Sequence, residues 1–292
     1  MGKNIQMGTA ENPEYPRTLA EDVFFKKGQS LKDRVSDVIV VDASGNGDYT
    51  DLQEAINNAG DTEQHPKTII VMKGTYVMPT ATDKSVHRNR RFISIIGVSR
   101  NDCIIRNDKG IYTNSPSYED NAPIKLMGKV LLKNLTIIST KTKYSGSELC
   151  TSYCVHFDYL ANINDECVID NCTLENDHYA CVGIGMACNV TIRNSSLKTT
   201  APTASTYGGT IYAHNQSVSG TPTLRLEYNL IVNVGSNTNM RIGYSASFSG
   251  GCKVEAAYNR CIGGNVSISP EFKISEFSYG NNVNELNYYA EG

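Results

Sequence analysis

A segment of the form apolar–polar–apolar–polar–Asn recurs along this chain and constrains its fold more than any other feature. The five copies are KVLLKNLTII (129–138), CVIDNCTLEN (167–176), NVTIRNSSLK (189–198), LRLEYNLIVN (224–233) and KVEAAYNRCI (253–262). The last two copies carry the Asn one place later than the first three. The steps between Asn134, Asn171, Asn194, Asn229 and Asn259 are 37, 23, 35 and 30 residues. Repeats of this length predict a solenoid, in which each coil buries its apolar face against its neighbours.

The alternation within each copy predicts strands whose alternate side chains point into a shared interior. Leu132, Ile169 and Ile192 stand two places before the Asn in the first three copies, and we expect them inside. Asn suits the bend between two strands because it tolerates the left-handed conformation and bonds to nearby backbone. The prediction is an all-β, right-handed parallel β-helix, a single-stranded solenoid of about seven or eight coils. An antiparallel sandwich would need frequent two-residue hairpin turns, and Asn-Gly occurs once, at Asn46-Gly47.

The stretch VVDASGNGDYTDLQEAI (40–56) predicts how the solenoid begins. A strand over 38–41 runs into a Gly-rich turn, and a short helix over 50–59 follows. Thr50 and Gln53 have the spacing of a capping box at its start. The apolar face of this helix consists of Leu52, Ala55, Ile56 and Ala59. We therefore expect an N-terminal capping helix over the open end of the β-helix.

This opening resembles the pectin methylesterase and pectin-lyase-like superfamily, in which such a helix plugs a right-handed β-helix. Methylesterases of the family use an acid Asp and a nucleophilic Asp on adjacent coils. By resemblance, Asp177 in NCTLENDHYACVGIG (171–185) is the only match to the acid. The following segment, LKTTAPTASTYGG (197–209), has no carboxylate, and the chain contains no Trp for the family's Gly-Arg-Pro-Trp segment. We expect no pectin methylesterase activity, because that mechanism needs both carboxylates.

A second cluster of candidate site residues comprises His156, Asp158, Asp177 and His178. His156 and His178 are 22 residues apart, close to one coil, and we expect them to stack on one outward face beside the two carboxylates. Such a face can bind sugar, hold a cation, or act as acid and base. A solvated polar face without function explains the same pattern, because every β-helix exposes polar residues. Exposed tyrosines that can stack on sugar rings are a further expectation: Tyr207, Tyr212, Tyr244, Tyr258, Tyr288 and Tyr289.

The composition excludes several function classes. The net charge of −3 gives no electrostatic case for nucleic acid, and no apolar run is long enough to insert into a membrane. The nine cysteines, an odd number, fall largely in strand-like runs. They suggest buried free thiols in a chain that folds in a reducing compartment. We expect no metal site, since no CxxC pair with zinc spacing occurs, and no cofactor. The N-terminus lacks the apolar core of a secretory signal, which indicates a protein folded in the cytoplasm.

Three segments follow from these patterns: an attachment or assembly segment over 1–37, the β-helix over 38–268 and a C-terminal extension over 269–292. The run PRTLAEDVFFKKGQSLKDRV (16–35) resembles the leading segments of bacteriophage tail and fibre proteins. That resemblance implies a virion surface or tail spike protein that is assembled in a host cytoplasm as a homotrimer. Its partners would be a cell-surface polysaccharide and, through residues 1–37, other virion proteins. The rival is a pectin-lyase-fold enzyme, a polysaccharide lyase or glycoside hydrolase.

Overall fold

The computed structural model describes residues 24–26, 29–30, 37–60, 62–78, 91–107, 111–112, 122–126, 128–140, 142–144, 148–150, 153–157, 165–185, 189–200, 210–214, 222–233, 238–242, 252–262, 265–268, 274–280 and 283–284. The chain forms two compact units, Met1–Val38 and Ile39–Gly292. Within the first unit, β1 (Phe24–Lys26) and β2 (Gln29–Ser30) pair in antiparallel fashion. This pairing differs from that of the three large sheets of the second unit, which are parallel throughout.

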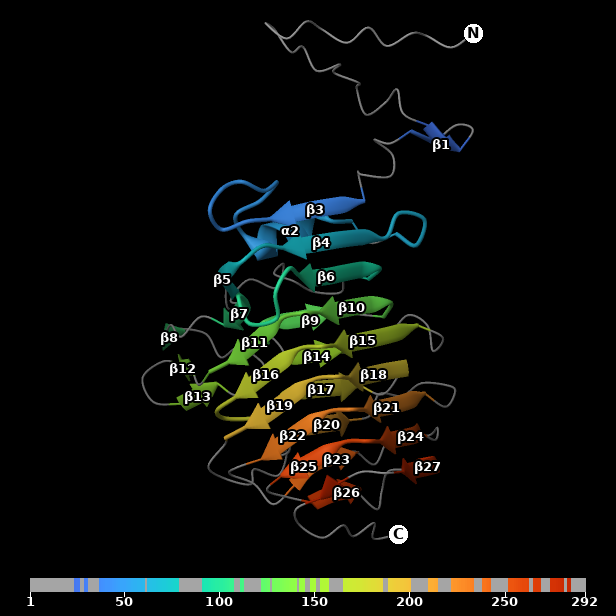
Figure 1. The fold of residues 1–292 in the computed structure, drawn as a ribbon. Helices are drawn as coiled ribbons and strands as arrows, with labels where there is room; N and C mark the ends of the chain where they lie inside the picture. The colour runs from blue at the N-terminus through green and yellow to red at the C-terminus, as the bar shows by residue number, and fades with distance from the viewer. Residues whose placement is uncertain are drawn as a thin grey trace, which may run out of the picture. The chain divides into compact units, whose positions relative to one another are not determined.

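Three parallel sheets account for most of the strands among the described residues (Figure 1). Sheet I contains β3 (Val38–Val41), β4 (Lys67–Val71), β6 (Ile93–Gly97), β10 (Val130–Lys133), β15 (Glu166–Asp170), β18 (Asn189–Arg193), β21 (Thr223–Glu227), β24 (Cys252–Ala257) and β27 (Ile274–Gly280). Sheet II contains β5 (Gly74–Met78), β7 (Cys103–Asn107), β11 (Thr136–Ser139), β16 (Thr173–Asn176), β19 (Ser196–Thr199), β22 (Leu230–Asn233), β25 (Arg260–Ile262) and β28 (Val283–Asn284). Sheet III contains β9 (Ile124–Leu126), β14 (Val155–Phe157), β17 (Val182–Gly185), β20 (Ile211–His214), β23 (Thr238–Ile242) and β26 (Asn265–Ile268).

The chain passes from sheet I to sheet II to sheet III and back, one coil at a time. Strands β15, β16 and β17 form one such coil, and β18, β19 and β20 form the next, paired with the first in parallel register. The architecture is a parallel β-helix, as the repeats predicted. A small side sheet of β8 (Ile111–Tyr112), β12 (Thr142–Tyr144) and β13 (Glu148–Cys150) accompanies it.

The interior of the β-helix is built from in-register rows of apolar side chains. Leu132, Ile169 and Ile192, expected inside, are adjacent in three successive coils and fully buried. The row continues through Leu226 to Ala256. Each aliphatic side chain buried in this way contributes about 1.5–3 kcal/mol, because its surface is removed from water. The alternation read from the sequence therefore gives the correct register.

Helix α2 (Leu52–Asn58) lies at the β3 end of the coil stack and packs against β4 and β5 (Figure 1). The four residues of its predicted apolar face are all buried. The predicted capping box is wrong, because the N-cap is Asp51, whose side chain accepts a hydrogen bond of 2.8 Å from the backbone N–H of Glu54. A carboxylate one residue closer to the helix satisfies this N–H, so Thr50 is not needed as the cap.

The turn between sheets I and II has a left-handed residue in successive coils. Asn134, Asn171 and Asn194 occupy it, with φ of 54°, 52° and 53°, as the sequence predicted. In the next two coils the equivalent residues are Tyr228 and Tyr258, with φ of 54° and 58°. This conformation costs a bulky residue roughly 1 kcal/mol more than it costs Asn or Gly. The Asn of the fourth and fifth repeats therefore does not make the bend.

Asn229 and Asn259 lie one place after the bend, inside the turn, where Cys172 and Ser195 stand in earlier coils. The Asn229 amide donates to the carbonyl of Ile192 at 2.7 Å and to Oδ1 of Asn259 at 2.9 Å. Its Oδ1 accepts from the backbone N–H of Ser195 at 3.0 Å. Asn side chains thus bond to one another along the stack here, and also between Asn171 and Asn134, at 2.8 Å.

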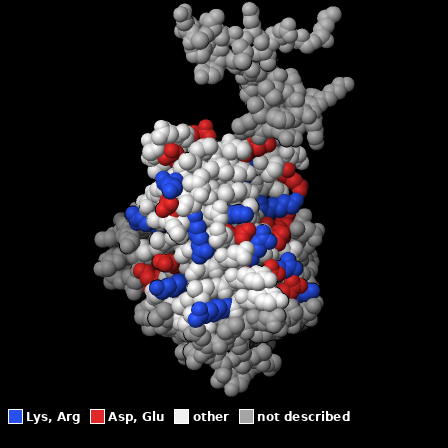
Figure 2. Space-filling model, viewed as in Figure 1, with Lys and Arg blue, Asp and Glu red and all other residues white. Residues whose placement is uncertain are grey.

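The outer face of sheet I carries interleaved charges (Figure 2). Asp170 lies between Arg193 at 3.2 Å and Lys133 at 3.6 Å, and Asn194 donates to it at 3.0 Å. Partial burial acts to raise the pKa of Asp170, but the hydrogen bonds from Asn194 and Arg193 and the two positive charges outweigh it and hold this pKa below its usual value. Arg225 makes a similar pair with Glu255 at 2.7 Å. This face is an ordered ion-pair surface.

The β-helix continues past the boundary expected at residue 268. Strand β27 pairs in parallel with β24, and β28 pairs with β25. The Asn repeat stops at Asn259, but the alternating run ISEFSYG (274–280) still supplies a strand without that turn.

The described residues contain no helix with the length and apolar character that a membrane span requires.

Candidate functional site

His156, one of the predicted site residues, is fully buried on β14, where an outward solvated position was expected. The Tyr153 ring covers it, with ring centroids 4.8 Å apart and planes inclined by 25°. In the adjacent coil the residue in register with His156 is Gly183, so the expected stacking of His156 on His178 is wrong. A Cβ at Gly183 would lie 2.6 Å from the Tyr153 ring. The missing side chain at Gly183 therefore makes room for the ring that buries His156.

Tyr212 stands beyond Gly183 in the same row and extends this aromatic layer. It is in register with Gly183, and its ring lies 6.5 Å from that of Tyr153 at 8°. Tyr212 is only 3% exposed, so the expectation that it stacks on a sugar is wrong. The predicted site residue Asp158 lies outside the described residues, as do Tyr207, Tyr244, Tyr288 and Tyr289. Sheet III thus carries a covered aromatic layer around His156.

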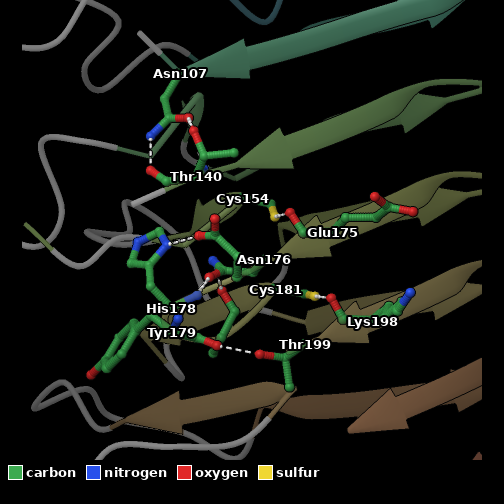
Figure 3. A network of polar contacts seen from close by, with 12 residues as sticks. Asn107, Thr140, Cys154, Glu175, Asn176, His178, Tyr179, Cys181, Lys198 and Thr199 are labelled. Atoms are coloured by element: carbon green, nitrogen blue, oxygen red, sulfur yellow. Dashed lines mark hydrogen bonds and ion pairs between the residues drawn. The ribbon is translucent and has the colours of Figure 1, made fainter. Parts of the chain in front are cut away.

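Asp177 and His178 lie in the turn between β16 and β17, which Asn176 shapes (Figure 3). Oδ1 of the buried Asn176 accepts from the backbone N–H of His178 at 3.0 Å and of Tyr179 at 2.7 Å. Its Nδ2 donates to the carbonyl of Ala180 at 2.8 Å. Since one amide side chain satisfies three backbone groups, the turn has a defined conformation.

The Asp177 carboxylate faces solvent while its histidine partner is buried. Nδ1 of His178 lies 2.8 Å from Oδ1 of Asp177, and the two side chains are 1% and 48% exposed. The exposed group of the pair is the carboxylate, so His178 acts on the surface only by fixing the position of Asp177. Of the four predicted site residues, Asp177 alone is a described residue with an exposed side chain.

A hollow of about 290 Å³ opens beside Asp177 at the ends of β11, β16 and β19. Its polar lining comes from three successive coils: Ser139 and Thr140, then Glu175, Asn176 and Asp177, then Lys198 and Thr200. Glu175 and Lys198 are exposed and in register on adjacent strands. The hollow thus contains two carboxylates and one ammonium group. Sequence reasoning missed Glu175 and Lys198, although both stand four residues after the repeated Asn.

Hydroxyl groups flank Asp177 in both neighbouring coils. The parallel ladder continues past the strand ends, with Asp177 N–H donating to Ser139 and Thr200 N–H donating to Asn176. This places Thr140 on one side of Asp177 and Thr200 on the other. Neither position holds the second carboxylate that a paired-aspartate esterase requires.

Ser139 adds a buried polar atom to the lining. Its side chain is fully buried, and its Oγ has no hydrogen-bond partner among the described residues. An unsatisfied buried hydroxyl costs about 1–3 kcal/mol.

Beneath the hollow, thiols and a hydroxyl tie sheet III to sheet II in three successive coils. Cys154 donates to the carbonyl of Glu175 at 3.1 Å, Cys181 to that of Lys198 at 3.2 Å, and Thr210 to that of Val232 at 3.3 Å. Burial raises the pKa of Cys181 well above its usual value. The six cysteines whose side chains the structure describes are buried thiols outside any disulfide, as expected, which makes them structural groups: Cys103, Cys154, Cys167, Cys172, Cys181 and Cys261.

Within the part of the chain that the structure describes, no group of three or more His, Cys, Asp or Glu side chains is arranged to hold a metal ion.

No protein-family model and no curated protein matches the sequence. The structure is similar to pectin methylesterase PemA from Erwinia chrysanthemi, with 13% identity, coverage of 83% of this chain and 88% of that chain, and a TM-score of 0.45. It is also similar to pectin methylesterase from carrot, with 15% identity, 84% and 82% coverage and a TM-score of 0.33. A mutant pectin methylesterase in complex with a hexasaccharide is similar as well, with 12% identity, coverage of 85% of this chain and 93% of that chain, and a TM-score of 0.42. These likenesses carry no inference about activity.

Proposed function

We propose that this protein binds a cell-surface glycan in the hollow formed by Glu175, Asp177 and Lys198. The observation that carries the proposal is the convergence of two carboxylates, an ammonium group and two threonines from three coils on one hollow. Carboxylates accept hydrogen bonds from sugar hydroxyls, and charge-assisted bonds of this kind contribute about 1.5–3 kcal/mol each. The turn fixed by Asn176 holds Asp177 in place before the ligand arrives.

The charge of the hollow favours one class of sugar. Two carboxylates and one ammonium group leave a net negative charge, which repels the carboxylates of uronic acids. Neutral sugars and amino sugars, which carry no negative charge, fit this environment. The glycan we propose is therefore composed mainly of neutral or amino sugars.

Replacement of Asp177 by Asn tests this function. The change removes the charge and half of the acceptor capacity, so affinity for the bound sugar should fall about tenfold or more. Calorimetric titration with malto-, chitosan- and galacturonic-acid oligosaccharides measures it. Asp102→Asn, which removes a carboxylate of the same 48% exposure in the turn between β6 and β7, is the matched control and should bind like the unmodified protein. Equal affinity in all three proteins would overturn the proposal.

A catalytic role is the second candidate, and the presence of both Glu175 and Asp177 on one hollow favours it. Glycoside hydrolysis uses two carboxyl groups on either side of the scissile bond. Release of new reducing ends, abolished in both Asp177→Asn and Glu175→Gln, would establish the enzyme. Binding without turnover would leave the binding function alone.

We further propose that the protein is a virion surface appendage, a tail spike or fibre that repeats its glycan site as a homotrimer. A solenoid with a separate N-terminal unit supports this arrangement, and repetition converts weak contacts into avidity. Residues 1–37 would attach it to other virion proteins.

Deletion of residues 1–37 is expected to leave the β-helix folded, because the large sheets contain only strands that begin at Val38 or later. The same deletion should convert a trimer into monomers. Light scattering on the intact and shortened chains measures the mass, and circular dichroism with thermal melting verifies the fold. If both chains are monomers and the shortened one degrades a polysaccharide, the proposal of a virion appendage is wrong and the enzymatic function takes its place.

A further inference from the structure

Two exposed tyrosines occupy the bend between sheets I and II at consecutive coils. The rings of Tyr228 and Tyr258 stack with centroids 4.9 Å apart and planes within 3° of each other. They are 58% and 50% exposed, more than any other large hydrophobic residue in the described part of the chain. Their spacing follows from the strand register, in which the N–H of Tyr228 donates to the carbonyl of Ala257 at 3.2 Å. The pair is a fixed aromatic surface.

The fold does not require tyrosine at these two places. Asn134, Asn171 and Asn194 make the same bend in the preceding coils with nearly the same φ, and Asn adopts that conformation more readily than Tyr. Both rings also remain largely in water, so little hydrophobic burial compensates the backbone cost. A strained residue kept in place by its surroundings points to a function for its side chain.

The surroundings of the pair suit a sugar. Leu230, 36% exposed, adds apolar surface beside Tyr228. Arg225 and Glu227 come just before Tyr228 on β21, with side chains 40% and 36% exposed. An aromatic surface flanked by exposed polar groups binds the apolar face of a sugar ring while its hydroxyls bond to the polar groups.

The tyrosines and the hollow lie along the same sheet. Tyr228 leads into β22 and Tyr258 into β25, and β22 pairs with β19, the strand that carries Lys198. Leu230 stands one strand across from Lys198 and two residues back, because Lys198 is in register with Val232. Tyr228 stands two residues further back than Leu230. A strand spacing of about 4.8 Å and a rise of about 3.3 Å per residue therefore separate Tyr228 from Lys198 by roughly 14 Å. A short oligosaccharide spans that distance.

We propose that Tyr228 and Tyr258 form a second saccharide subsite, so that a bound glycan runs obliquely over the outer face of sheet II from the hollow to the tyrosine pair. The inference rests on the proposed function and names its ligand more closely. The glycan is an oligosaccharide of several neutral or amino sugars, in which a ring with an unsubstituted apolar face stacks on the tyrosines.

The double variant Tyr228→Asn/Tyr258→Asn tests the subsite. Asn is the residue that the fold itself uses at this bend, so the melting temperature should stay the same or rise. Affinity for maltohexaose or chitosan hexamer should fall about tenfold or more, since each lost aromatic contact lowers the affinity by up to about tenfold. Affinity for the corresponding disaccharides, which reach only the hollow, should not change. Tyr228→Phe/Tyr258→Phe keeps the rings and should bind both lengths normally.

The outcomes separate this inference from the proposed function. Hexasaccharide binding that depends on Asp177 but not on the tyrosines overturns the subsite and leaves the function standing. Binding that depends on the tyrosines but not on Asp177 overturns the function and leaves the subsite. If the Asn variant changes the mass seen by light scattering and not the sugar affinity, the pair is a contact between copies and the subsite is overturned. Failure of every probe to bind overturns both.

Discussion

Replacement of Ile192 by Asp is expected to prevent folding of the β-helix. Ile192 is fully buried in the middle of sheet I, between Ile169 and Leu226 in the adjacent coils. The row around it is apolar, so the new carboxyl group is buried without a partner. The combined cost of the lost apolar contacts and the buried polar group is roughly 5 kcal/mol or more, comparable to the whole stability of many domains.

Circular dichroism and urea denaturation measure this effect. Ile192→Val is the control, which removes one methylene at the same site and should cost about 1 kcal/mol. A soluble Asp variant that unfolds at the same urea concentration as the unmodified protein would show that the register of β18 is wrong.

Replacement of Gly97 by Ala is expected to have the second-largest effect. Gly97 ends β6, and a Cβ there would overlap the backbone carbonyl oxygen of Asn134 in the next coil and lie 3.0 Å from Cβ of Cys103. Because the obstacle is backbone on one side and core on the other, the coils themselves must move apart. Overpacking of this kind costs about 3 kcal/mol.

The matched control for Gly97 is its neighbour Val98, which is 47% exposed. Val98→Ala should change the free energy of unfolding by only a few tenths of a kcal/mol. If the two variants unfold at the same urea concentration, adjacent coils do not approach each other closely at Gly97.

The repeats were sufficient to predict the fold because their signal is local and recurs. Alternation places Ile169 and Ile192 inside, and a bend every coil requires a residue that tolerates positive φ, such as Asn171. The register at Asn229 was harder to read, because a buried amide inside the turn resembles in sequence an Asn at the bend. Only the Tyr before it distinguishes the two.

The site was less predictable because it depends on contacts between coils. The alternation of Val155, His156 and Phe157 places the side chain of His156 opposite to those of its two neighbours. It gives no sign that the Tyr153 ring, which occupies the space above Gly183, buries His156. Asp177 was identified through a family resemblance. Glu175 and Lys198 were available from the repeats themselves, since aligning CVIDNCTLEN with NVTIRNSSLK on Asn171 and Asn194 places one above the other.

The left-handed bend has one further consequence. Since Asn171 and Asn194 hold equivalent backbone positions 23 residues apart, a whole coil between such bends can be lost or duplicated without breaking strand register. Each coil inserted between the hollow and Tyr228 would move the two apart by one strand spacing, about 4.8 Å. If the hollow and Tyr228 bind one glycan as proposed, the number of coils between them would set the length of saccharide that contacts both.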